Sequence, residues 1–227
     1  MNHFSGGGSR RFGRELGQTR DWDVLCMQSI PAAGASFPGE LARISEAAAS
    51  ARQASHRKLE GILHRGAFTT LILHLAVELS CLDDPDRNNL EMEQPFTQIG
   101  PYLMDRIAGK ITKRTSHVMR LSANGLHSLR KKLDRLYDDI AFVEALYPKP
   151  HLSAYRARCE ELQEILGLAN DAVVTRRLVR GLVKSDSGNL ERPGRHILSW
   201  SKERRKEALR GLERATVNFR LASPFWR

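Results

Sequence analysis

Residues 126–147 carry the clearest hydrophobic pattern in the chain. Their apolar positions recur at alternating spacings of three and four: Leu126, Leu129, Leu133, Leu136, Ile140, Val143 and Tyr147. This spacing places them on one stripe of an α-helix that faces a core. Titratable residues lie beside the stripe at helical spacing: His127, Arg130, Lys131, Asp134 and Asp138. The segment therefore predicts a helix that packs through one face and presents charge on the next.

Residues 95–120 predict a second helix, which Gly100 and Pro101 could interrupt. This helix carries a row of basic residues: Arg106, Lys110, Lys113, Arg114, His117 and Arg120. At about 100° per residue, their side chains fall within about a third of the helix circumference. The row would span about 21 Å at a rise of about 1.5 Å per residue.

The remaining pattern predicts helices over residues 10–30, 39–66, 68–82 and 195–222, and one helix or a helix pair over 152–184. Gly, Pro and polar residues predict loops over 31–38, 83–89 and 185–194. The apolar helix 68–82 is too short to span a membrane and is expected to be buried. No segment shows sustained period-two alternation. We therefore expect an all-α protein of long helices packed as antiparallel bundles.

A short pattern, L-G-x-x-[R/N]-D, occurs at residues 16–21 and again at residues 166–171. A glycine inside a helix costs about 1 kcal/mol relative to alanine, so Gly17 and Gly167 predict close helix–helix approach. Two helical halves of common descent would explain the recurrence. One short match is equally consistent with chance.

The positive charge of the chain is localised. The net charge is +10 over 227 residues, and residues 101–135 hold nine Lys or Arg against two acidic residues, or +7 of that total. Such an excess suits a nucleic acid, a polyphosphate or an acidic membrane surface. The cysteines Cys26, Cys81 and Cys159 form no CxxC pair, which argues against disulfides and zinc and fits a reducing compartment. The N-terminus lacks the apolar segment of a signal peptide, so we expect a soluble cytoplasmic protein.

Several motifs occur in a fixed order along the chain. They are L-G-x-x-R-D-x-D-V at 16–24, A-S-H at 54–56, residues 65–73, L-H-S-L-R-K-K at 126–132, Y-P at 147–148, L-Q-E-I-L-G-L-A-N-D at 162–171, and S-P-F-W at 223–226. Together they resemble the conserved histidine α-helical domain, or CHAD. The resemblance implies two similar four-helix halves around a basic groove that binds inorganic polyphosphate.

The resemblance also implies a domain organisation. Residues 10–227 would form one CHAD-like domain, and residues 1–9 are expected to be a flexible N-terminus because they are rich in glycine. Within the domain, 10–120 is an incomplete N-terminal half without a counterpart of the family's first helix, and 121–227 is a four-helix C-terminal half. A second departure is Asp134, where the family carries a basic residue. Asp134 is expected to pair with Arg130 and Lys131, at a few tenths of a kcal/mol each.

The candidate polyphosphate-binding residues are Arg20, Arg52, His56, Arg106, Lys110, Lys113, Arg114, His117, His127, Arg130 and Lys131. Arginine can hold phosphate through two parallel hydrogen bonds, and lysine acts as a point charge. Histidine donates most strongly when protonated. Arg20 could instead pair with Asp21 or Asp23. The alternative interpretation of the set is a solvated basic face with structurally hydrogen-bonded histidines.

Catalytic signatures such as HExxH, GxSxG and the P-loop are absent from the sequence. The carboxylates at Asp83-Asp84-x-Asp86 and Asp138-Asp139 lack the spacing of a metal site. We therefore expect a binding module without turnover, cofactor, metal or membrane partner, associated with polyphosphate granules. The alternatives are a nucleic-acid backbone binder, an enzyme acting on phosphate anhydrides, and a truncated helical scaffold that no longer binds.

Overall fold

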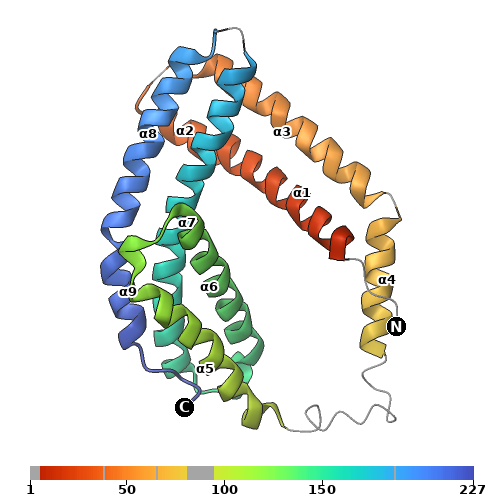
Figure 1. Ribbon diagram of the computed structural model, residues 1–227, viewed down its shortest axis with the longest axis vertical. Coiled ribbons are helices and arrows are strands. Elements are labelled where there is room, and N and C mark those ends of the chain that lie inside the picture. The colour runs from red at the N-terminus through yellow and green to blue at the C-terminus, as the bar shows by residue number, and fades with distance from the viewer. Residues whose placement is uncertain (1–5, 38, 65, 81–94, 187) are drawn as a thin grey trace. The chain divides into compact units, whose positions relative to one another are not determined.

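The structure is a computed structural model that describes residues 6–37, 39–64, 66–80, 95–186 and 188–227. The α-helices are α1 (Gly6–Val24), α2 (Ile30–Gly34), α3 (Ala42–Leu63), α4 (Ala67–Ser80), α5 (Phe96–Thr115), α6 (Ala123–Val143), α7 (Lys149–Ser185), α8 (Glu191–Arg210) and α9 (Leu212–Leu221) (Figure 1). A π-helical turn, η1 (Leu25–Ser29), joins α1 to α2, and 3-10 turns η3 (Val118–Arg120) and η4 (Glu144–Leu146) follow α5 and α6. The described residues contain no strand, which confirms the all-α prediction.

The chain forms two compact units that interleave along the sequence. The first contains residues 1–89 and 174–201, and the second contains residues 90–173 and 202–227. Helices α7 and α8 contribute to both units. The boundary predicted between residues 120 and 121 lies inside the second unit, because α5 packs there against α6 and α9.

The first unit is built on α1 packed along α3. Its buried apolar residues include Leu25, Ile44, Val179 and Ile197, which come from η1, α3, α7 and α8. Buried polar groups are matched to one another: the hydroxyls of Ser29 and Thr175 lie 2.9 Å apart. Segments separated by some 146 residues are therefore held together inside this unit by both apolar packing and a hydrogen bond.

Gly194, and not a glycine of the repeated pattern, marks a close helix–helix approach in the first unit. A Cβ on Gly194 would lie 2.5 Å from Cγ2 of Val183, whereas a Cβ on Gly17 or Gly167 would meet nothing within 4 Å. The close approach predicted at Gly17 and Gly167 is therefore wrong. The stiff β-branched side chain of Val183 leaves little room for accommodation, so α8 needs glycine at position 194.

The second unit is built around the predicted apolar stripe of α6. Its six residues between Leu126 and Val143 are all buried, and Tyr147 packs against them at partial exposure. Aromatic residues of α7, α9 and the C-terminus close this core, with the rings of Tyr155 and Trp226 centred 4.9 Å apart. Burial beside this cluster raises the pKa of the Cys159 thiol to about 12, so Cys159 is a packing residue.

Several helix ends differ from the predictions. Helix α1 begins at Gly6, inside the stretch expected to be loose, and helix continues through η1 into α2 despite Pro31. Pro31 stands in the first turn of α2, directly after the π-helical turn η1, where the regular α-helical hydrogen-bond pattern is already interrupted. Helix α7 runs without a break through Gly167, and the predicted C-terminal helix divides at Gly211 into α8 and α9.

Helix α4 is the apolar helix that was predicted to be buried, and this prediction is wrong. Five of its large apolar residues are 47–61% exposed, whereas Phe68 and Leu71 are partly exposed: the five are Ile72, Leu73, Leu75, Val77 and Leu79. The helix is mostly apolar, whereas α3 is its main neighbour among the described residues. In the described part of the chain, no helix is both long and apolar enough to cross a membrane. Cys81 and the acidic loop 83–89 lie outside the described residues.

Candidate polyanion-binding site

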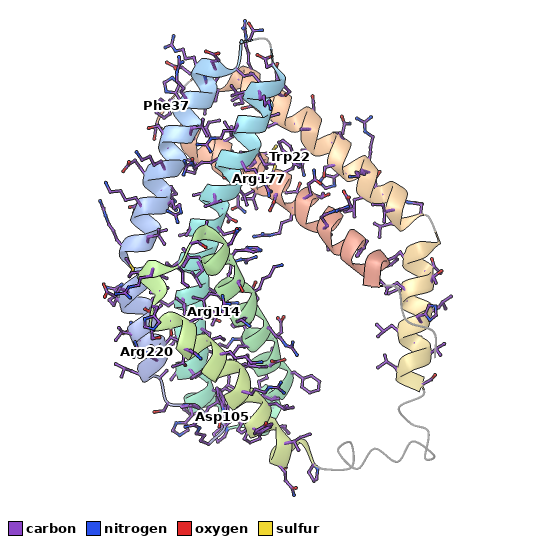
Figure 2. All side chains as sticks on the ribbon, in the orientation of Figure 1. Trp22, Phe37, Asp105, Arg114, Arg177 and Arg220 are labelled. Carbon is purple, nitrogen blue, oxygen red and sulfur yellow. The ribbon has the colours of Figure 1, made fainter. Side chains whose placement is uncertain are left out.

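Helix α5 carries the basic row predicted from its sequence, but the helix is shorter than expected. It accommodates Pro101 without interruption and ends at Thr115. His117 caps the 3-10 turn η3, which contains Arg120, so these two residues do not continue the helix. The helical part of the row therefore runs from Arg106 to Arg114, over about 12 Å at about 1.5 Å per residue. Arg114 is labelled on α5 in Figure 2.

A shallow concavity of about 370 Å³ gathers part of this row. Its lining residues are Lys110, Lys113, Arg114, His117, Leu121 and Lys132. His117 thus remains beside the row although it has left the helix. Lys132 comes from α6 and was not predicted as a site residue, because it lies on the face of α6 beside α5 and not on the face that carries His127. Its position three residues before Arg135 on that face was the available signal.

The basic residues around this concavity share one electrostatic property. Across the residues that the structure describes, none of the following forms an ion pair: Arg106, Lys110, Lys113, Arg114, His117, Arg120, Lys131 and Lys132. Like charges at helical spacing repel one another, so such a row is destabilising unless an anion offsets it. The arrangement therefore favours a bound polyanion.

A different polar face of α6 packs against α7. Nδ1 of His127 donates to Oδ1 of Asn170 over 3.0 Å, and Nε2 of Gln163 donates to Oδ1 of Asp134 over 3.1 Å. Nη1 of Arg130 lies 3.3 Å from Oδ2 of Asp134, which confirms the predicted pair between these residues. His127 and Arg130 are therefore engaged inside the second unit, whereas Lys131 is exposed.

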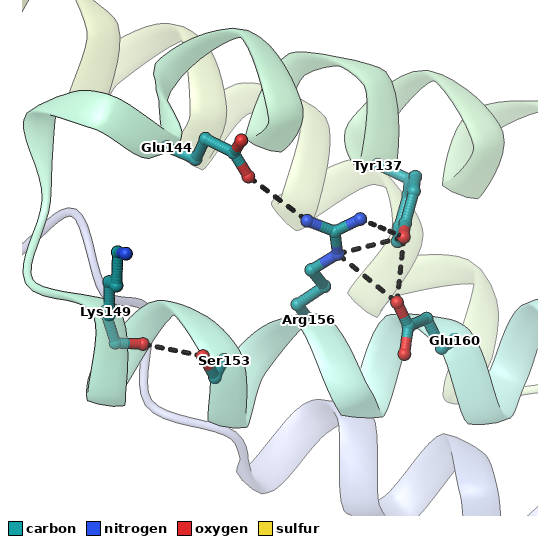
Figure 3. A network of polar contacts seen from close by, with 6 residues as sticks. All are labelled: Tyr137, Glu144, Lys149, Ser153, Arg156 and Glu160. Atoms are coloured by element: carbon teal, nitrogen blue, oxygen red, sulfur yellow. Dashed lines mark hydrogen bonds and ion pairs between the residues drawn. The ribbon is translucent and has the colours of Figure 1, made fainter.

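Arg156, a further cation of the second unit, is held by three side chains of the protein itself (Figure 3). Arg156 on α7 donates from Nε to the Tyr137 hydroxyl over 2.9 Å and pairs with Glu144 at 3.1 Å and Glu160 at 3.2 Å. The hydrogen bond to Tyr137 is the main cause that raises the pKa of Arg156. These contacts join α6, η4 and α7, so Arg156 serves packing.

The remaining candidate residues lie in the first unit, and each has an interaction partner within the protein: Arg20, Arg52 and His56. Nε of Arg52 donates to Oδ1 of Asp23 over 2.6 Å, and Nε2 of His56 lies 2.9 Å from the same oxygen. Burial raises the pKa of Asp23, but the hydrogen bonds from His56 and Arg52 outweigh burial and lower it. Asp21 pairs with Arg177 at 2.6 Å, and exposed Arg20 also has an interaction partner.

Comparison of the sequence with curated proteins finds no significant match. The family model of the CHAD domain matches residues 8–180, which is 173 of the 227 residues. CHAD domains are associated with polyphosphate binding in general. Two of the motifs in this set meet in the structure, because His127 of the L-H-S-L-R motif is hydrogen-bonded to Asn170 of the L-G-L-A-N-D motif. With this contact and a match over most of its length, the chain belongs to the CHAD domain family.

Proposed function

We propose that this protein binds inorganic polyphosphate through the cations of α5 and the adjoining face of α6. The observation that carries the proposal is the row from Arg106 to Arg114, together with His117 and Lys132, which forms no ion pair within the described residues. Polyphosphate carries about one negative charge per phosphate, and release of its counterions would supply the affinity.

The side chains of the row suit a flexible chain of phosphates. Arg106 and Arg114 would each hold phosphate oxygens through two N–H groups, and Lys110 and Lys113 would act as point charges between them. His117 adds a donor, which becomes a cation on protonation. Because contacts of this kind form no covalent bond, we propose binding without turnover.

Binding to the polymer would also determine where the protein resides. A chain of this kind would concentrate on polyphosphate granules in the cytoplasm. Loss of granule association in a charge-reversed variant, at unchanged protein level, would be the corresponding observation in cells.

A nucleic-acid backbone is the second candidate ligand, because the same row would contact its phosphates. The tryptophans give it little support: Trp226 is buried and donates to Asp105, and Trp22 packs at the first core. Aromatic stacking is the usual supplement to backbone contacts with single strands. Competition at equal phosphate concentration would separate the ligands, and preference for RNA would contradict the polyphosphate proposal.

The decisive experiment is a salt titration of long-chain polyphosphate binding with wild-type protein and Arg114→Glu. We expect log affinity to fall linearly with log salt, by about 0.7 per phosphate contact, and the variant to lose at least one contact. Undetectable binding at low salt, or equal slopes for both proteins, would contradict the proposal. Phosphate release that persists through purification and disappears in His127→Ala would indicate an enzyme instead.

A further inference from the structure

A second pocket lies between α5 and α6, next to the concavity described above. Its volume is about 420 Å³, within the range of small-molecule sites. Apolar walls come from Leu103 and Phe142, and positive charge comes from Arg106, Lys110 and Arg135. Phe142 contacts a neighbouring group yet is 81% exposed. The pocket therefore combines an apolar wall with cations.

Asp139 adds a carboxylate to the apolar side chains and cations that line this pocket. Its Oδ2 atom is shielded from solvent and has no hydrogen-bond partner in the described structure. A buried acceptor without a hydrogen-bond partner is destabilising. Arg135 acts on Asp139 only through its charge, so Asp139 needs a donor that the described residues do not supply. The carboxylate torsion of aspartate is broad, so a small rotation would turn this oxygen toward a ligand in the pocket.

The pocket and the neighbouring concavity share Lys110. A ligand whose head fills the pocket could therefore extend a short phosphate chain past Lys110 toward Lys113, Arg114 and His117. Polyphosphate alone does not match the pocket, because its oxygens gain nothing from apolar walls and are repelled by Asp139. The occupant must carry an apolar face, an N–H donor and several phosphates.

We propose that the α5–α6 pocket binds the base of a guanine nucleoside polyphosphate whose phosphates lie along the basic row. The guanine ring would lie against Leu103 and Phe142. Guanine presents two adjacent N–H donors, and a carboxylate is an acceptor-only group that can take both. Burial raises the pKa of Asp139, and a pair of N–H donors would oppose that shift by stabilising the ionised form.

The experiment is calorimetry with GTP and with inorganic tripolyphosphate, which carries the same number of phosphates without the base. Because the phosphates use the proposed polyphosphate row, this inference rests on the proposed function. We expect GTP to bind about tenfold more tightly than tripolyphosphate, as one or two hydrogen bonds to a charged acceptor would give. ATP should bind more weakly than GTP, because adenine presents one donor and one acceptor on that edge.

The key variant is Asp139→Asn, which keeps the shape of the side chain and offers a single acceptor. It should abolish the preference for GTP over tripolyphosphate. Asp138→Asn is the matched control, since it makes the same charge change at the adjacent, exposed position and should keep the preference. Thermal unfolding of both variants would confirm that each is folded.

The outcomes separate the two proposals. Equal affinities of the wild type for GTP and tripolyphosphate, equal affinities for GTP and ATP, or the same behaviour in both variants would overturn the guanine site. If long-chain polyphosphate still binds in those cases, the proposed function stands. If neither GTP, tripolyphosphate nor long-chain polyphosphate binds, both proposals fail.

Discussion

Two pairs of basic residues with the same helical spacing have different surroundings in this protein. Arg52 and His56 on α3 share one carboxylate oxygen of Asp23, at 2.6 and 2.9 Å. Lys110 and Arg114 on α5 form no ion pair within the described residues. The sequence spacing is i, i+4 in both cases, so spacing alone does not distinguish a structural contact from a ligand site. The presence of a carboxylate close to the cations distinguishes the structural contact from the ligand site.

The same contrast occurs within the second unit. Arg156 and Arg130 each pair with a carboxylate, whereas four cations form no ion pair within the described residues: Lys110, Lys113, Arg114 and Lys132. A partly exposed ion pair contributes only about 0–1 kcal/mol, but a polyanion would have to displace it before gaining that cation. Cations without an ion-pair partner therefore predict a binding surface better than cations that already pair with a carboxylate.

The largest effect is expected from reversing both free cations of the pair on α5. Lys110→Glu combined with Arg114→Glu should lower polyphosphate affinity about a hundredfold at about 0.1 M salt, because each lost contact is worth about fivefold and reversal adds repulsion. Arg180→Glu combined with Lys184→Glu is the matched control, with the same spacing and charge change on α7. Fluorescence titration of both would decide, and equal losses would indicate diffuse attraction to net charge.

A smaller effect should follow from removing the carboxylate that pairs with Arg130. Asp134→Asn removes the carboxylate that Arg130 pairs with at 3.3 Å, while the amide oxygen can still accept from Gln163. Removing the negative charge that pairs with Arg130 should raise polyphosphate affinity about fivefold and steepen the salt dependence by about one contact, if Arg130 then adds to the row. An unchanged salt slope would show that Arg130 stays outside the site.

Arg52 should affect stability and not binding. Arg52→Gln breaks the 2.6 Å contact with Asp23 and should lower the free energy of unfolding by about 1 kcal/mol, since the pair is about a third exposed. Urea unfolding measures this loss. The slope of the salt titration should remain at the wild-type value. A slope reduced by about 0.7 would instead show that Arg52 contacts phosphate.

The smallest effect concerns acid stability. The hydrogen bond from Trp226 is the main cause that lowers the pKa of Asp105 below its usual 3.8, with Arg227 adding to it and burial opposing it. A lowered folded-state pKa gives stability that is present above the unfolded value and is lost as pH falls through the folded value. Asp105→Asn should therefore flatten the fall in stability below about pH 4 by less than about 1 kcal/mol.

Urea unfolding at pH 5 and pH 3 would measure that effect. Asp23 also has a lowered pKa, so its stabilising contribution should be lost in the same direction. The variant Asp105→Asn thus keeps the Asp23 contribution and removes only the one in the second unit. An identical pH dependence in wild type and variant would show that the bond from Trp226 does not couple to protonation.

The hydrophobic stripe of α6 could be predicted completely, because helical periodicity is a local property of the sequence. The end of α5 could not, since no proline or glycine after Thr115 marks it. Burial of α4 was inferred from its composition, but burial depends on neighbours that cover it. Lys132, Arg135 and Asp139 were missed as site residues because they became relevant only once the face of α6 beside α5 was known.

By itself, the sequence determined the helical fold, the family and the concentration of positive charge between residues 101 and 135, because each is expressed in local pattern, motif order or composition. Only the tertiary structure decided which cations are free. Asp23 lies 29 residues from Arg52, Glu144 lies 12 residues from Arg156, and Asp21 lies 156 residues from Arg177 along the chain. Charge pairing acts through space, so a one-dimensional pattern records the cations but not their partners.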